Sequence, residues 1–116
     1  MKSTFSEVKL FQVKPDKLEA FETLIQAIAE EQKQRPGCIS VTYMKRFYIF
    51  DDIKAQPRQL TKIVKCVKYY SCWDFDTIEH YADATHWFFE TYSKELFKLL
   101  LMPFDINCGD TVVSFS

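Results

Sequence analysis

The order of helical and extended segments is the feature that most constrains the fold of this chain. Apolar residues recur at three- and four-residue steps over two segments, which begin near Pro15 and Asp76 and predict two amphipathic helices. β-Branched and aromatic residues fill four further segments and predict strands at 5–13, 38–50, 60–73 and 111–115. The resulting order βαββαβ predicts a ferredoxin-like α+β sandwich, with two helices on one side of a four-stranded antiparallel sheet.

Local signals set the expected helix ends. Pro15 suits the first turn of the first helix, and the glycine of "RPG" at 35–37 ends it. We expect Asp76 to cap the second helix, with Glu79 three residues later completing a capping box, and Pro103 to end it.

The strands at 38–50 and 60–73 predict a long hairpin, because each exceeds the usual ~5–6 residues. They are joined by "DDIKAQPRQ", where Pro57 is incompatible with a central strand. We expect this 50–60 loop to reach past the sheet, where it touches a partner subunit or roofs a cavity.

Both faces of the third strand are apolar. One face would carry Leu60, Val64, Cys66, Tyr70 and Cys72, and the other Ile63, Val67, Tyr69 and Trp73. A sheet with water on one side should instead alternate with polar residues, and monomers expose few large apolar patches. We therefore expect a second copy of the chain and a ligand to cover the face without helices.

Length, composition and charge narrow the class of protein. A chain of 116 residues predicts a single domain over 1–116. The net charge of −1 argues against nucleic acid and membrane partners, and only two glycines are present to build a phosphate loop. The N-terminus lacks the pattern of a signal peptide, so we expect a cytoplasmic protein with four cysteine thiols.

Four short motifs resemble those of the antibiotic biosynthesis monooxygenase family of dimeric α+β barrels. They are Lys14-Pro15-Asp16, Pro36-Gly37-Cys38, Trp73 at the end of a strand, and a following helix with His80 and His86. The resemblance implies a homodimer whose sheets pair back to back around a cavity. It also implies oxygenation of polycyclic phenols without metal, flavin or haem.

The resemblance disfavours one activity of related proteins. Haem-degrading relatives need an asparagine on the first strand and a histidine further along the second helix. The matching positions here are Lys9 and Asp83, so we do not expect haem degradation.

Six residues are candidates for a site. Trp73 either stacks on a flat ligand, as the resemblance implies by placing it near the barrel side, or fills the core. His80 and His86 are either bases or ordinary helix-border residues. Six positions apart on a helix, they point in different directions, so we expect no metal between them. Tyr43, Tyr69 and Tyr81 are candidate hydrogen-bond donors to the ligand.

These features predict a cofactor-independent monooxygenase that acts on an aromatic or polyphenolic small molecule. The alternative is a non-catalytic ligand-binding or interaction domain of the same fold. An open cavity with a polar group favours the enzyme, and a cavity filled by the protein's own rings favours the alternative.

Overall fold

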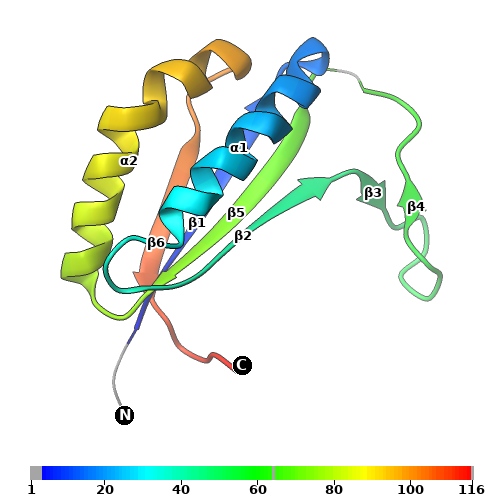
Figure 1. Ribbon diagram of the computed structural model, residues 1–116. Helices are drawn as coiled ribbons and strands as arrows, with labels where there is room; N and C mark the ends of the chain where they lie inside the picture. Colours follow the sequence, from blue (N-terminus) through cyan, green and yellow to red (C-terminus); the bar gives the residue numbers. More distant parts are fainter. Residues whose placement is uncertain (1–3, 64, 116) are drawn as a thin grey trace.

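A four-stranded antiparallel sheet forms one layer of the protein, and two helices cover one of its faces (Figure 1). The computed structural model describes residues 4–63 and 65–115. The sheet order is β2 (Cys38–Arg46), β5 (Val67–Phe75), β1 (Phe5–Val13) and β6 (Asp105–Asp110). The helices are α1 (Leu18–Gln32), which follows a 3-10 turn at Pro15–Lys17, and α2 (Ile78–Leu99). The predicted ferredoxin-like α+β fold is confirmed.

The core lies between the sheet and the helices and is rich in aromatic side chains. Alternate residues of a strand point to the same face, so every second residue of β1 and β5 enters this core. On β5 the buried set is Val67, Tyr69, Ser71, Trp73 and Phe75. The structure therefore places Trp73 on the helix-covered face, where it is 0% exposed, and not near the side expected to line the barrel.

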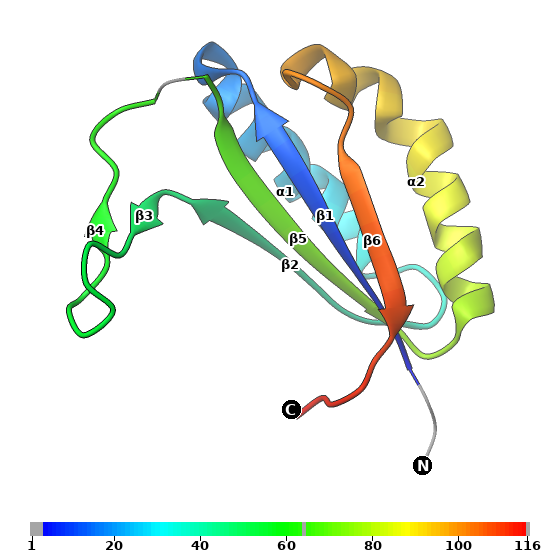
Figure 2. The ribbon, with the colours of Figure 1, turned by 180° about the vertical axis from the view of Figure 1, so that it is seen from behind.

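Within the part of the chain that the structure describes, no helix lies over the other face of the sheet, as the view from behind shows (Figure 2). Cross-strand register brings Val8 beside Cys72, and it brings Leu10 beside Tyr70 and Tyr70 beside Met44. Val8 is 40% and Met44 53% exposed. We call these five residues the open sheet face. Val64, expected on the same side, lies outside the described residues.

The predicted long hairpin is interrupted. β2 ends at Arg46, and Phe47 leaves the ladder to pack against the core. Beyond it, β3 (Tyr48–Ile49) and β4 (Arg58–Gln59) form a separate two-stranded sheet, which projects from the end of β2 (Figure 1). The Arg58 guanidinium, 2.7 Å from the Asp51 carboxylate, braces this hairpin arm. The strand expected over 38–50 is therefore interrupted at Phe47, and the strand expected over 60–73 was wrong for residues 60–63, 65 and 66, because β5 begins only at Val67.

The start of α2 and the last strand also differ from expectation. Thr77, not Asp76, is the N-cap of α2, and its hydroxyl accepts the His80 N–H at 3.1 Å. The last strand is Asp105–Asp110 instead of 111–115. Its partner β1 begins at Phe5, and the last backbone hydrogen bond between the two segments runs from the Thr111 N–H to the Thr4 carbonyl. Residues 112–115 therefore extend past the end of β1 and have no strand beside them to pair with.

Among the described residues, neither helix is long and apolar enough to cross a bilayer.

Candidate functional site

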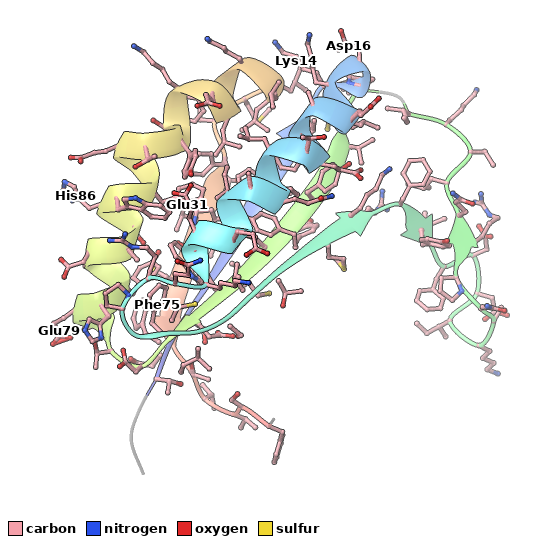
Figure 3. The ribbon with its side chains drawn as sticks, in the orientation of Figure 1. Lys14, Asp16, Glu31, Phe75, Glu79 and His86 are labelled. Carbon is pink, nitrogen blue, oxygen red and sulfur yellow. The ribbon has the colours of Figure 1, made fainter. Side chains whose placement is uncertain are left out.

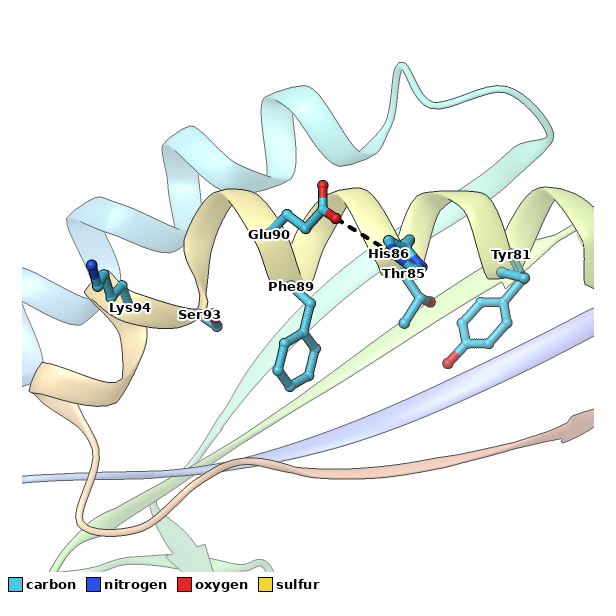
Figure 4. A pocket seen from close by; sticks show the side chains of 8 residues that line it. Tyr81, Thr85, His86, Phe89, Glu90, Ser93 and Lys94 are labelled. Carbon is cyan, nitrogen blue, oxygen red and sulfur yellow. Dashed lines mark ion pairs between the residues drawn. The ribbon is translucent and has the colours of Figure 1, made fainter.

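A groove of about 900 Å³ runs along α2 (Figure 4). Tyr81, Thr85 and Phe89 lie four residues apart, which aligns them on one side of the helix. Figure 4 shows the Tyr81 and Phe89 rings pointing from α2 toward the strands. The remaining lining residues are Ala82, His86, Glu90, Ser93 and Lys94. We call this hollow the α2 groove.

A buried ion pair lies directly behind Tyr81. Glu7 and Lys9 are two residues apart on β1, so both side chains point into the core, and both are fully buried. The Lys9 ammonium donates to Glu7 Oε1, and the Tyr81 hydroxyl donates to Glu7 Oε2 at 2.5 Å. Charged residues are rarely buried without such partners. Tyr81 therefore connects the α2 groove to a charged pair inside the core.

Aromatic rings surround the Lys9 ammonium. Its nitrogen lies 4.3 Å from the Phe88 ring centroid and 4.9 Å from that of Trp73, within the range of cation–π attraction. Burial lowers the pKa of Lys9, and the adjacent Glu7 carboxylate opposes that effect. Glu7 and the two rings thus supply the favourable interactions that offset removal of the ammonium from water.

Tyr81 is neutral at physiological pH. Burial, followed by its hydrogen bond to Glu7, raises the pKa of Tyr81, and the nearby Thr85 hydroxyl opposes the rise. The Thr85 oxygen itself is buried. Across the ladder, Cys108 of β6 pairs with Glu7, which places its thiol on this same face of the sheet.

The two predicted histidines occupy different surroundings. His86 lines the α2 groove, is mostly exposed, and lies 3.4 Å from Glu90 (Figures 3 and 4). His80 sits in the first turn of α2, with Nδ1 2.8 Å from the Asp76 carboxylate, and does not line the groove. Only His86 is therefore placed to meet a ligand there.

Tyr43 and Tyr69 lie beside a second, smaller pocket of about 330 Å³ next to α1. The Tyr43 hydroxyl donates to Gln32 Oε1 at 2.6 Å, and the Tyr69 hydroxyl donates to Glu22. Burial is the main cause that raises the pKa of both tyrosines. The candidate residues therefore divide between two places and do not form one site.

Several residues of the groove and its base were not among the sequence candidates, namely Glu7, Thr85 and Phe89. Glu7 and Lys9 alternate with Phe5, Phe11 and Val13 on the core face of β1. A period of two would therefore have marked both as buried charges that need each other. Thr85 and Phe89 follow Tyr81 at four-residue steps, which is a weaker signal because every helix face has such neighbours.

No cluster of three or more His, Cys, Asp or Glu side chains suited to a metal ion occurs within residues 4–63 and 65–115. Cys38, Cys66, Cys72 and Cys108 are free thiols.

Comparison with known proteins connects this fold to one family. Residues 4–51 match the model of the antibiotic biosynthesis monooxygenase family, which confirms the resemblance predicted from the motifs. No curated protein matches the sequence.

Solved structures match nearly the whole chain. Rv0793 from Mycobacterium tuberculosis has a TM-score of 0.71 at 13% identity, and covers 98% of this chain and 100% of its own. SnoaB, a cofactor-independent oxygenase from Streptomyces nogalater, has a TM-score of 0.61 at 15% identity, covering 97% and 95%. A conserved protein from Methanosarcina mazei Go1 has a TM-score of 0.63 at 17% identity, covering 93% and 92%. The TM-scores show that these proteins share the fold of this chain, and at identities this low the likeness concerns the fold alone.

Proposed function

We propose that this chain, which has the fold and the N-terminal sequence pattern of the antibiotic biosynthesis monooxygenases, is a cofactor-independent monooxygenase. Its substrate would be a flat aromatic polyphenol bound in the α2 groove. The observation that carries the proposal is the groove itself, in which the Phe89 ring lies in line with the Tyr81 and Thr85 side chains. Its volume of about 900 Å³ is within the usual range of small-molecule sites.

Phe89 supplies an aromatic surface for such a ligand. Its ring is 44% exposed, with centroid distances of 5.4 Å to Phe104 and 6.3 Å to Phe97. Aromatic pairs contribute about 0.5–1.5 kcal/mol beyond the area they bury. We assign to Phe89 the stacking role that the sequence suggested for Trp73, and propose that Trp73 supports the site from behind by enclosing Lys9.

The reaction needs only the substrate and dioxygen. A base removes a proton from an activated C–H or phenolic O–H, and the resulting anion passes one electron to oxygen. Recombination of the two radicals forms a C–O bond and a peroxide. Loss of water then converts a CH₂ group to a carbonyl, so that R₂CH₂ and O₂ yield R₂C=O and H₂O. The protein contributes orientation, a water-poor surface and the base.

We propose His86 as that base and not His80, because only His86 lines the groove. An imidazole accepts protons near neutral pH, and a general base typically accelerates a reaction about 10²–10⁴-fold.

We further propose that the protein works in the cytoplasm as a homodimer joined through the open sheet face. Free thiols are typical of a reducing compartment. The exposed Val8 and Met44 side chains would be removed from water in such a dimer, together with apolar residues of the hairpin arm.

An oxygen electrode tests the proposal. With 1,8-dihydroxyanthrone in chelator-treated buffer, the protein should consume one O₂ for each anthraquinone formed, well above the rate of spontaneous oxidation. His86→Gln should lower kcat by about 10²–10⁴-fold. Phe89→Ala should raise KM by about threefold to tenfold, as expected for one lost ring contact.

His80→Gln is the matched control, because it removes the other histidine without touching the groove. Its kcat should stay within about twofold of wild type, a free-energy difference of only a few tenths of a kcal/mol. Binding of the anthrone without oxygen uptake would contradict catalysis and support the non-catalytic alternative.

A further inference from the structure

Two positive side chains face each other where β2 ends beside the start of β5. Arg46 and Lys68 are direct partners across the ladder between these strands, so both side chains leave the same face of the sheet. Like charges placed directly opposite each other destabilise a sheet. This pair therefore adds nothing to the stability of the sheet, and a bound anion would replace its repulsion with attraction.

The pair lines a small pocket together with a third cation, Lys62. The pocket has a volume of about 60 Å³, and its other lining residues are Phe47, Leu60, Ile63, Cys66 and Val67. No acidic side chain is among them. Sites for whole drug-sized ligands usually measure about 300–1,000 Å³, so this pocket suits a single small group with negative charge.

The three cations have no partner of opposite charge within the protein. Arg46, Lys62 and Lys68 form no ion pair within residues 4–63 and 65–115. The Arg58 guanidinium of the hairpin arm, by contrast, lies 2.7 Å from the Asp51 carboxylate. The cations of the pocket are exposed, so an anion can reach them from solvent.

Two hydrogen bonds hold the segment that bears Lys62 against the sheet. The Leu60 N–H donates to the Phe47 carbonyl at 2.8 Å, and the Cys66 thiol donates to Gln12 Oε1 at 3.7 Å. These contacts lie on either side of Lys62 in the sequence. The third cation is therefore carried by a segment that is attached to the sheet at both ends.

We propose that this pocket binds the phosphate group of a small organic phosphate ester, whose apolar part lies against Leu60 and Ile63. The planar guanidinium of Arg46 matches two phosphate oxygens, and the ammonium groups of Lys62 and Lys68 add charge. A phosphate monoester carries about −1.5 to −2 charge at neutral pH, so it compensates the three cations better than a carboxylate does. The inference does not depend on the proposed oxygenase activity.

Isothermal titration calorimetry near neutral pH, with butyl phosphate and pentanoate as probes, tests the proposal. Both probes lack an aromatic ring, so they differ from the ligand proposed for the α2 groove. Wild-type protein should bind butyl phosphate at one saturable site, and pentanoate roughly tenfold more weakly, as expected for one lost hydrogen bond to a charged group. Added salt should weaken the binding, because it screens exposed charges.

Arg46→Gln and Lys68→Gln should each weaken butyl phosphate binding by roughly tenfold to a hundredfold. Lys33→Gln is the matched control, because it removes the same charge from a side chain outside the pocket that pairs with Glu30 at 2.8 Å. Its affinity should stay within about twofold of wild type, since exposed charges beyond a Debye length are largely screened.

Melting curves give a second readout. Lys68→Gln relieves the pair of like charges, so it should keep or raise the melting temperature while it weakens binding. A lower melting temperature with unchanged binding would show instead that the pair serves the fold, and would overturn the proposal.

The absence of saturable butyl phosphate binding by the wild-type protein would also overturn it. Equal weakening by Lys68→Gln and Lys33→Gln would do the same, because such a result would reflect net charge alone. Pentanoate binding as tight as that of butyl phosphate would reject the assignment to phosphate.

Discussion

At the scale of single residues, the buried charges of Glu7 and Lys9 compensate each other, since each would be costly to bury alone. Removing one member of a buried ion pair leaves an uncompensated charge and typically costs about 3–5 kcal/mol. Replacing both members with neutral groups of similar size is often neutral, or stabilising by roughly 1–4 kcal/mol. The presence of this pair therefore says little about how stable the protein is. It says more about how the core is arranged, because Glu7 must lie between Lys9 and Tyr81.

We expect Lys9→Met to lower the free energy of unfolding by about 3–5 kcal/mol, since Glu7 would be left charged in the core. The double variant Glu7→Gln/Lys9→Met should recover most of that loss, because the amide oxygen still accepts the Tyr81 hydrogen bond. Urea unfolding of the wild type, both single variants and the double variant measures the coupling. Additive losses would show that the two charges do not compensate each other.

Residue-scale prediction from the sequence succeeded only where a pattern was local. The alternation along Phe5–Val13 correctly separates the core residues of β1 from Val8 and Leu10 on the other face. The side occupied by Trp73 was not predicted from burial, because both faces of its strand are apolar and only packing against the helices decides between them. Likewise, the contact of Tyr81 with Glu7 joins residues 74 positions apart, which no local spacing reveals.

At the scale of elements, the turn before β2 packs directly against the start of α2. Gly37 has φ of +81°, and its carbonyl accepts the Asp76 N–H at 2.9 Å. A side chain at Gly37 would overlap the Asp76 carboxylate and the His80 imidazole. The glycine is therefore needed both for its backbone conformation and for the close approach of α2.

We expect Gly37→Ala to lower the free energy of unfolding by about 2 kcal/mol or more, because backbone strain of this kind alone costs about 1–3 kcal/mol. Gly109→Ala is the matched control, since nothing lies within 4 Å of a Cβ built there. The control should change stability by no more than about 0.5 kcal/mol. Equal effects in the two variants would show that the contact between Gly37 and the start of α2 tolerates a side chain.

The elements themselves were largely predictable, with instructive exceptions. Both helices follow from apolar periodicity, and β1 was predicted with the bounds it has. The hairpin arm and the last strand were misplaced because strand propensity does not specify a partner. Residues 111–115 have the composition of a strand, but β1 offers no further edge for them to pair with.

At the scale of the whole molecule, one face of the sheet lacks a cover. We expect a homodimer mass by light scattering at micromolar concentration, because the open sheet face carries exposed apolar side chains and stable interfaces bury at least about 1,000 Å². Met44→Lys should shift the mass to that of a monomer. Ile78→Lys changes a residue of similar exposure on α2, 54% against 53%, and should leave the dimer intact.

A monomer mass for the wild-type protein would contradict this prediction. Dissociation by Ile78→Lys but not by Met44→Lys would move the interface to the helical side. The back-to-back pairing of sheets was predicted from the resemblance together with the doubly apolar strand. Neither the sequence nor a single subunit specifies the rotation between two copies.

The buried Glu7–Lys9 pair also has a consequence for how this protein can change over generations. A lineage that loses either charge first passes through a variant weakened by several kcal/mol, a large fraction of the ~5–15 kcal/mol that keeps a domain folded. The neutral double variant is stable but two mutations away. Related chains should therefore keep both charges or neither, and the Tyr81 hydroxyl should be inherited together with the acceptor at position 7.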